Sequence, residues 1–500
     1  MHRSIARAGT LALSLALSGA AGAQTPHEGE PPEQLGEVNF QVSCTPDAQR
    51  TFNRAMALFH SFWFDPAKQA FAQVLEQDPN CAMAHWGIAI MSMGNPLAWP
   101  PSPPALQAGA EAWGRAQQLG AGSERENAYI HALGAFFKDW QSTEHRPRAL
   151  ALEQAMGELA ARYPQDVEAQ ILHALMLNAT AQPTDKTYAN QLKAAGILEP
   201  LYRQYPNHPG IAHYLIHTFD YTSLAERGMP YARAYADIAP SVPHVQHMPS
   251  HIFSRVGDWP AMVESNLASY QAARQELQAT TLDIGTYDAL HALDYLVFGH
   301  LQQAQHQAAK QRVDEVAAIR KVNVENFVAA YAFAAIPARY ALERGQWQEA
   351  AALQLSPGNP GAARADVERL QALQAAMRQS NLGYWADQAE FQIRAVNAWI
   401  AQAENRPDDA LRLMREAADL EEASDKHPVT PGNVVRSREL LAELLVVQKQ
   451  PAEAFAEFER SLQRDPNRLR ATKGAMEAAK AAGNAEAARR YEQKVAVLTA

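Results

Sequence analysis

The stretch PAEAFAEFERSLQRDPN, residues 451–467, combines a helix-forming composition with an ordered set of small, aromatic and helix-breaking residues. Counted from the first small residue of that set, the offsets 0, +4, +7 and +12 hold Ala454, Phe458, Ser461 and Pro466. Residues spaced by three or four lie on one face of a helix, so this face is suited to close packing and burial. The proline ends the helix because it lacks the N–H that the next turn requires. The stretch therefore predicts the second helix of a short helical hairpin.

The same order of residues recurs along the chain at a period close to 34 residues. The copy nearest the N-terminus, DPAKQAFAQVLEQDPN (65–80), has Ala67, Phe71, Val74 and Pro79 at the same offsets. Further copies end at Pro164, Pro206 and Pro240 or contain RGQWQEA (344–350) and NRPDDALRLMREA (405–417). These offsets are those of the tetratricopeptide repeat (TPR). Since one hairpin cannot bury its apolar face alone, we predict an all-α, right-handed TPR solenoid of stacked helical hairpins.

The N-terminus has the order of charge and hydropathy that is typical of a secretory signal peptide. Arg3 and Arg7 precede an apolar run, residues 11–17, and the small residues Ala21-Gly22-Ala23 follow it. We expect cleavage near Ala23 and a periplasmic or secreted location for the mature protein. The remaining divisions that we expect are a disordered, Pro/Gly-rich lead over 24–43, an N-terminal TPR-like solenoid over 44–340, and C-terminal TPR-like repeats over 341–500.

Composition excludes several functional classes. The chain has 500 residues and a formal net charge of −10, and no run of basic residues stands out, so nucleic acid is not an expected partner. After the signal segment no run of 18 apolar residues occurs, so we expect no membrane span. The only cysteines are Cys44 and Cys81, and in an exported protein such a pair favours a disulfide over two buried thiols.

Two histidine pairs fall one repeat apart. HYLIHTFDY (213–221) contains His213 and His217, and HMPSHIFSR (247–255) contains His247 and His251, so each pair is separated by four residues and corresponding members by 34. The prolines of the repeat place both pairs at the fifth and ninth positions of successive first helices, which line the concave groove of TPR folds. We therefore expect the four imidazoles to face one small volume.

A third segment could complete a metal site. DALHALDYLVF (288–298) contains His291 and Asp294 at the spacing i, i+3. The predicted metal-site residues are His213, His217, His247, His251 and His291, with Asp220 and Asp294 as further ligands or supports of the imidazoles. Imidazole suits copper, zinc and iron. If the site is catalytic, a redox metal with three histidines for each ion would suit O2 chemistry, whereas zinc or iron would activate water for hydrolysis.

Other residues are weaker candidates. The predicted pocket residues are His60, His85, Trp86, Tyr214, Arg255 and Asp288. Of these, Trp86 could instead be core packing. Neither histidine pair reads HExxH, which disfavours a zincin protease, and no phosphate-binding loop or nucleophile motif is found. The alternative to a metal site is a non-enzymatic scaffold whose groove binds a peptide, a protein segment or a small molecule.

Five stretches resemble a family of exported bacterial TPR proteins. They include LFHSFW (58–63), HYLIHTFD (213–220), HMPSHIF (247–253) and HALDYL (291–296), and the similarity covers most of residues 44–300. The resemblance implies a TPR fold and export, and it leaves the reaction open.

Overall fold

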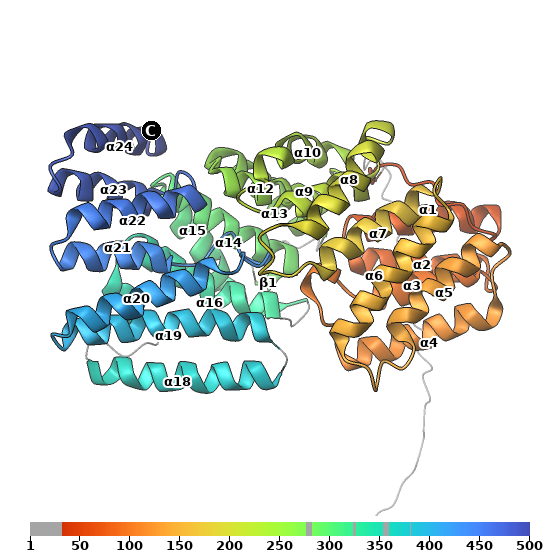
Figure 1. The fold of residues 1–500 in the computed structure, drawn as a ribbon. Helices are drawn as coiled ribbons and strands as arrows, with labels where there is room; N and C mark the ends of the chain where they lie inside the picture. The colour runs from red at the N-terminus through yellow and green to blue at the C-terminus, as the bar shows by residue number, and fades with distance from the viewer. Residues whose placement is uncertain (1–32, 277–282, 324–326, 354–359, 381) are drawn as a thin grey trace, which may run out of the picture. The chain divides into compact units, whose positions relative to one another are not determined.

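The computed structural model describes residues 33–276, 283–323, 327–353, 360–380 and 382–500 (Figure 1). The first helices are α1 (Pro46–His60), α2 (Phe64–Gln77), α3 (Ala82–Ser92), η1 (Pro96–Ala98), α4 (Pro103–Leu119), α5 (Glu124–Phe137), α6 (His145–Arg162), α7 (Val167–Thr180) and α8 (Ala189–Gln204). The middle of the chain forms α9 (Pro209–Phe219), α10 (Ala225–Ile238), α11 (Pro243–His247), α12 (Pro249–Val256), α13 (Trp259–Glu276), α14 (Tyr287–Gln302) and α15 (His306–Ala318). The last helices are α16 (Phe327–Glu343), α17 (Trp347–Ala352), α18 (Pro360–Gln379), α19 (Gly383–Ala403), α20 (Pro407–Glu422), α21 (Ser437–Val447), α22 (Pro451–Arg464), α23 (Leu469–Ala481) and α24 (Ala485–Leu498).

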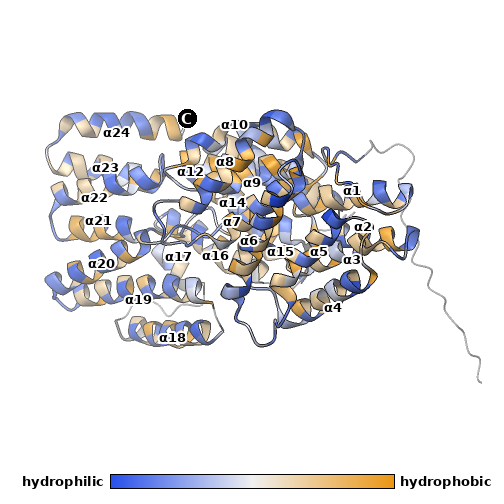
Figure 2. Ribbon diagram, turned by 45° about the vertical axis from the view of Figure 1, so that its right-hand side comes forward, coloured by the Kyte–Doolittle hydropathy of each residue, from blue (hydrophilic) through white to orange (hydrophobic). Residues whose placement is uncertain are grey.

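The fold is an all-α TPR-type solenoid, because most helices pack chiefly against the helices before and after them in the chain. The strand pair among the described residues is short: β1 (Ile284–Gly285) and β2 (Lys321–Val322) pair in parallel. Figure 1 shows helices α18 to α24 as a ladder of stacked layers. Figure 2 shows both hydrophobic and hydrophilic residues on the helices of this ladder, as expected for helices that bury one face.

The repeat pattern explains how neighbouring helices approach. In α22 the buried residues are Ala454, Phe458 and Ser461, the three pattern positions that precede the proline. The Phe458 ring occupies the space that a Cβ on Gly474 of α23 would need. Gly87 of α3 stands in the same relation to Phe71 of α2, also 16 residues earlier. Aromatic ring and glycine therefore form one packing unit that allows close contact between hairpins.

The N-terminal region corrects one expectation. The disordered lead was expected to reach residue 43, but the part of it that the structure describes packs on α1. Phe40 is fully buried, its ring lies against Phe52 and Trp86, and its backbone N–H donates to Asn53 Oδ1 at 3.1 Å. The cause is a set of apolar side chains in an otherwise polar stretch, because Leu35 is buried like Phe40, and Val38 and Val42 pack against the same core. The predicted signal peptide and residues 24–32 lie outside the described residues.

Two further expectations concern the cysteine pair and membrane-spanning helices. Cys44 and Cys81 form the predicted disulfide, which joins the starts of α1 and α3, with Cα atoms 5.3 Å apart. Across the described parts of the chain, every helix is too short or too polar to span a bilayer.

The expected boundary between residues 340 and 341 falls inside α16, and residues 34–500 form one compact unit. The C-terminal repeats return to the middle of the chain through the turn between α22 and α23. There Trp259 Nε1–H donates to the Asn467 carbonyl at 2.9 Å, and the Leu469 N–H donates to Gln302 Oε1 at 2.9 Å. Contacts between residues far apart in sequence therefore hold the two sets of repeats together.

Candidate metal centre

Six histidines gather in two groups on four helices. The first group is His213 and His217 of α9 with His244 of α11, and the second is His247 of α11, His251 of α12 and His291 of α14. Within each group the atoms able to bind an ion lie within 4.8 Å of one another. We call these groups the first and second triads.

The distances within the triads match those between ligands of one ion. In the first triad, His213 Nε2 lies 3.1 Å from His217 Nε2 and 3.3 Å from His244 Nε2. In the second, His247 Nε2 lies 3.1 Å from His251 Nε2, and the His247 and His291 ring centroids are 4.2 Å apart. Nitrogens about 2.0–2.1 Å from a tetrahedral ion lie roughly 3.3 Å apart. Each triad therefore has the spacing of a trihistidine metal site.

The two triads adjoin each other and differ in exposure at one residue. The His217 and His251 ring centroids are 5.6 Å apart, and those of His244 and His247 are 6.1 Å apart. Five of the six histidines are buried, whereas His217 is partly exposed. The four predicted imidazoles were expected to face one small volume, and they lie in two adjoining groups within it. Each i, i+4 pair converges within its own repeat, and the distance between repeats keeps the pairs apart.

A proline determines where α12 begins. Pro249 begins α12, as its missing N–H allows, so His247 ends α11 and His251 lies in the first turn of α12. His244, three residues before His247 on the same helix, belongs to the first triad, whereas His247 belongs to the second. The three histidines of α11 and α12 are thus divided between two sites.

Hydrogen bonds at Nδ1 fix the protonation of three of the imidazoles. The Nδ1 atoms of His213, His247 and His251 lie 2.6 Å from the His60 carbonyl, 2.7 Å from Asn266 Oδ1 and 2.9 Å from Asp220 Oδ2, respectively. Asn266 Nδ2 donates to the Met262 carbonyl at 2.7 Å, so its oxygen faces His247. Because these acceptors hold the proton on Nδ1, each Nε2 presents a lone pair to its triad.

His247 and His251 consequently face each other with two lone pairs 3.1 Å apart. A proton on either Nε2 would make that imidazole cationic. Burial, the main cause, lowers the pKa of both side chains, so they remain neutral near pH 7. Two buried acceptors without a donor between them repel each other, and a cation between them removes the repulsion.

Aromatic rings cover the triads. Phe62 stacks over His217 and His244 at centroid distances of 6.0 and 5.7 Å, and Tyr295 lies 4.6 Å from His247. Phe62 has φ of +53°, a left-handed conformation that is costly for a phenylalanine. Strain of this kind is typical of residues held in place at functional sites.

The two predicted aspartates have different roles. Asp220 accepts from His251 Nδ1–H, from Arg255 Nε–H at 2.7 Å and from Lys426 at 3.1 Å. Burial opposes its ionisation, but Lys426 and Arg255 together hold its pKa well below the usual value. Asp220 therefore supports His251 as an anion and is not placed as a ligand.

Asp294 does not join the site. Its carboxylate is paired with Arg339 of α16, with N–O distances of 2.9 and 3.2 Å. The spacing i, i+3 from His291 suggested a shared face, but α14 packs against several helices and Asp294 turns toward α16. The prediction that Asp294 is a ligand or support of the imidazoles is therefore wrong.

The predicted pocket residues are spread over three environments. His85 and Trp86 lie on α3, which packs mainly against α2 and α4, and Trp86 is fully buried beside Phe40. Trp86 is therefore core packing. Arg255 is buried in its pair with Asp220, whereas Asp288 is half-buried with Oδ1 4.0 Å from His244 Nδ1. Asp288 thus contacts the first triad, and Arg255 reaches the second triad through Asp220.

His60 and Tyr214 belong to a third buried group, which lies behind the first triad. His60 Nε2 and His208 Nε2 lie 2.9 and 3.0 Å from the two oxygens of Glu168, and the Tyr214 hydroxyl lies 2.9 Å from His60 Nδ1. The Gly210 N–H donates to His208 Nδ1 at 3.2 Å. Every imidazole nitrogen in this group has a partner, so we call it the satisfied triad. It positions His60, whose carbonyl accepts from His213.

Sequence reasoning missed several residues of the site. His244 could have been found, because it precedes His247 by three residues and so lies within one helical turn of it. Asn266, Glu168 and Lys426 carry no local signal, since their partners lie 19 to 206 residues away.

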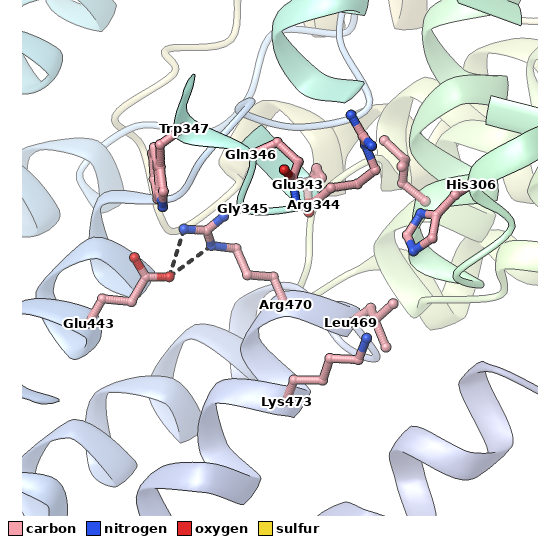
Figure 3. Close-up of a pocket in the computed structure, with 11 residues that line it drawn as sticks. His306, Glu343, Arg344, Gly345, Gln346, Trp347, Glu443, Leu469, Arg470 and Lys473 are labelled. Carbon is pink, nitrogen blue, oxygen red and sulfur yellow. Dashed lines mark hydrogen bonds and ion pairs between the residues drawn. The ribbon is translucent and has the colours of Figure 1, made fainter. Parts of the chain in front are cut away.

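A separate pocket of about 460 Å³ lies among the later helices (Figure 3). Its lining residues are Leu301, His306, Glu343, Arg344, Gly345, Gln346, Trp347, Glu443, Leu469, Arg470 and Lys473. Trp347 is 51% exposed, and the Arg470 guanidinium lies 5.2 Å from its ring centroid while pairing with Glu443 at 2.7 Å. The pocket thus offers an aromatic surface beside basic side chains.

Comparisons with known proteins give structural similarity alone. No family model and no curated protein matches the chain. Among solved structures, the APC/C hetero-tetramer Cut9–Hcn1 is 14% identical, with a TM-score of 0.37 over 89% of this chain and 79% of that one. The human IFIT1 dimer with m7Gppp-AAAA is 12% identical, with a TM-score of 0.42 over 92% and 91%. Similarity at this level says nothing of function, and the fold description rests on the helix packing itself.

Proposed function

We propose that this protein is an exported TPR solenoid that binds two metal ions side by side, one in each histidine triad. The observation that carries the proposal is the pair of buried Nε2 atoms of His247 and His251, 3.1 Å apart, on imidazoles whose Nδ1 atoms both face an acceptor oxygen. The same spacing recurs around His213 in the first triad. The signal segment and the disulfide support export.

The ligand chemistry favours copper. The members of the two triads are six imidazoles, and among divalent first-row metals such nitrogen ligands bind copper most tightly. Zinc is the alternative, since three histidines also form a zinc site that keeps one position open. Copper would supply electron transfer and oxygen chemistry, whereas zinc would supply an activated water.

The residues of the chain have defined tasks in this proposal. His60, Asn266 and Asp220 hold the proton on Nδ1 of their histidines and so keep Nε2 available. Phe62 and Tyr295 limit water on the buried sides. His217, the partly exposed histidine, marks the side from which a small molecule reaches the ions.

Elemental analysis of the purified full-length protein tests the proposal. After loading with copper or zinc and removal of free ions, we expect about two ions per chain. The triple variant His213→Ala, His247→Ala, His251→Ala should retain neither ion. A wild-type protein that takes up no copper, zinc or iron would contradict the proposal.

A second function, protein or peptide binding, is supported by the pocket around Trp347. The exposed Trp347 indole and the Lys473 ammonium, which both line the pocket, suit an acidic peptide through stacking and charge. Calorimetry with an acidic and a basic peptide of equal length tests it. Binding of the acidic peptide that is lost in Trp347→Ala would favour the scaffold function; equal or absent binding of both would reject it.

A further inference from the structure

The charges around the two triads sum to zero before any ion is bound. Among the described residues, a carboxylate contacts each triad, Asp288 beside His244 and Asp220 beside His251. Asp220 pairs in turn with the cations of Arg255 and Lys426. Asp294 and Arg339 neutralise each other nearby. The protein therefore has no excess negative charge to offset bound ions. Uncompensated charge in a buried site is unfavourable, so a further anion is needed.

The buried ammonium group of Lys426 contributes to this lack of excess negative charge. It comes from the loop between α20 and α21, 206 residues after Asp220, and its side chain is 2% exposed with Nζ 3.1 Å from Asp220 Oδ2. Burial lowers the pKa of Lys426 to about 8, and the charge of Asp220 opposes that shift, so the ammonium form predominates at pH 7.

Asp220 does not need Lys426 to be satisfied. Arg255 already pairs with Asp220 through Nε at 2.7 Å and donates from Nη2 to the Asp220 carbonyl at 2.6 Å. His251 donates to the other carboxylate oxygen. One carboxylate thus faces two cations, so Asp220 supplies no net negative charge beside the second triad.

Resting on the proposed function, we infer that the paired metal centre takes an anionic ligand and that Lys426 is the positioning residue that selects for it. The ligand class is a small anion with an oxygen or nitrogen donor. Such an anion is either a free inorganic ion or the carboxylate or phenolate group of an organic substrate.

The test uses copper-loaded full-length protein, with azide as the inorganic probe and benzoate as the organic one. Azide binding is followed by its charge-transfer absorbance, and benzoate by competition with azide. Lys426→Met should bind azide at least about tenfold more weakly at unchanged copper content, because one nearby positive charge is lost. Lys426→Arg should restore most of the affinity. Lys186→Met is the matched control, since Lys186 pairs with Asp425 of the same loop at 2.7 Å.

The outcomes separate the two proposals. Protein that loads no metal overturns both. Protein that loads two ions but binds azide equally well with Met or Lys at position 426 overturns only the inference. If Lys426→Met does not fold, the wild type decides: we expect azide to bind more tightly than neutral pyridine, and the reverse order overturns the inference. Tighter binding of benzoate than of azide would assign the anion to an organic substrate, and the reverse to an inorganic ion.

Discussion

The satisfied triad and the second triad contain the same kind of residue in equally buried surroundings, yet they differ in where the protons lie. In the satisfied triad, the Glu168 carboxylate accepts from both Nε2–H groups, and Tyr214 and Gly210 donate to the two Nδ1 atoms. In the second triad, acceptors hold Nδ1 of His247 and His251, and the two Nε2 atoms face each other without a donor.

The difference teaches how to distinguish a structural histidine cluster from a metal site. Proximity alone does not distinguish the two kinds of cluster, because in both groups the atoms able to bind an ion lie within 4.8 Å of one another. What decides is the count of donors and acceptors. A cluster in which each nitrogen has a complementary partner is complete, whereas one with converging lone pairs needs a cation.

The largest expected effect comes from removing the converging lone pairs. His247→Ala combined with His251→Ala should lower the bound metal from about two ions per chain to about one, because a single remaining imidazole cannot hold the second ion. Elemental analysis of the folded protein measures this. His85→Ala on α3 is the control and should keep both ions. If the double variant also keeps both ions, the distinction between the satisfied triad and the second triad is wrong.

The satisfied triad should respond in stability and not in metal content. Glu168→Gln replaces one acceptor oxygen by an NH2 group that faces an imidazole N–H, so we expect unfolding free energy to fall by about 3 kcal/mol. Urea denaturation of metal-free protein gives this value. If the variant instead loses metal while keeping its stability, the satisfied triad is a metal site.

Acid titration of the same pair of proteins gives a second test. Burial opposes ionisation of Glu168, but His60 and His208 lower its pKa well below the ordinary value in the folded state. A depressed pKa contributes stability above the unfolded-state pKa of about 4.3, and this contribution falls as the pH drops below that value. The stability difference between wild type and Glu168→Gln should therefore shrink from pH 5 to pH 3. A constant difference would contradict the assigned charge.

A smaller effect is expected when the proton on a triad histidine is no longer held in place. Asn266→Ala removes the acceptor of His247 Nδ1–H, and we expect the affinity of the second triad for its ion to fall by about 10- to 100-fold. Competition with a chelator measures the affinity. Asn266→Asp, which keeps an acceptor oxygen, should retain more affinity than Ala; equal losses would assign Asn266 to packing alone.

The smallest effect is expected at the edge of the satisfied triad. Tyr214→Phe removes the hydroxyl that donates to His60 Nδ1, and we expect a loss of about 1 kcal/mol in unfolding free energy with both ions retained. Thermal unfolding with and without metal separates the two quantities. A loss of metal in this variant would mean that the two kinds of triad act as one unit.

The sequence by itself determined the features that depend on short-range order. The 34-residue period, the small and aromatic residues of α22 and the proline stops specify helical hairpins, because a helix face is set by residues three and four apart. The same rule placed His213 with His217 and His247 with His251 on neighbouring repeats. The cysteine pair is also of this kind, since both residues flank one hairpin.

Only the tertiary structure decided which groups satisfy which partners. Asp294 shares a turn with His291 but pairs with Arg339, 45 residues later, and Lys426 reaches Asp220 across 206 residues. Whether four histidines form one site or six form two depended on the distance between repeats and on the place of His244 in the first triad. Hydrogen-bond and charge partners are chosen among all groups that folding brings close, and a local pattern carries no record of that choice.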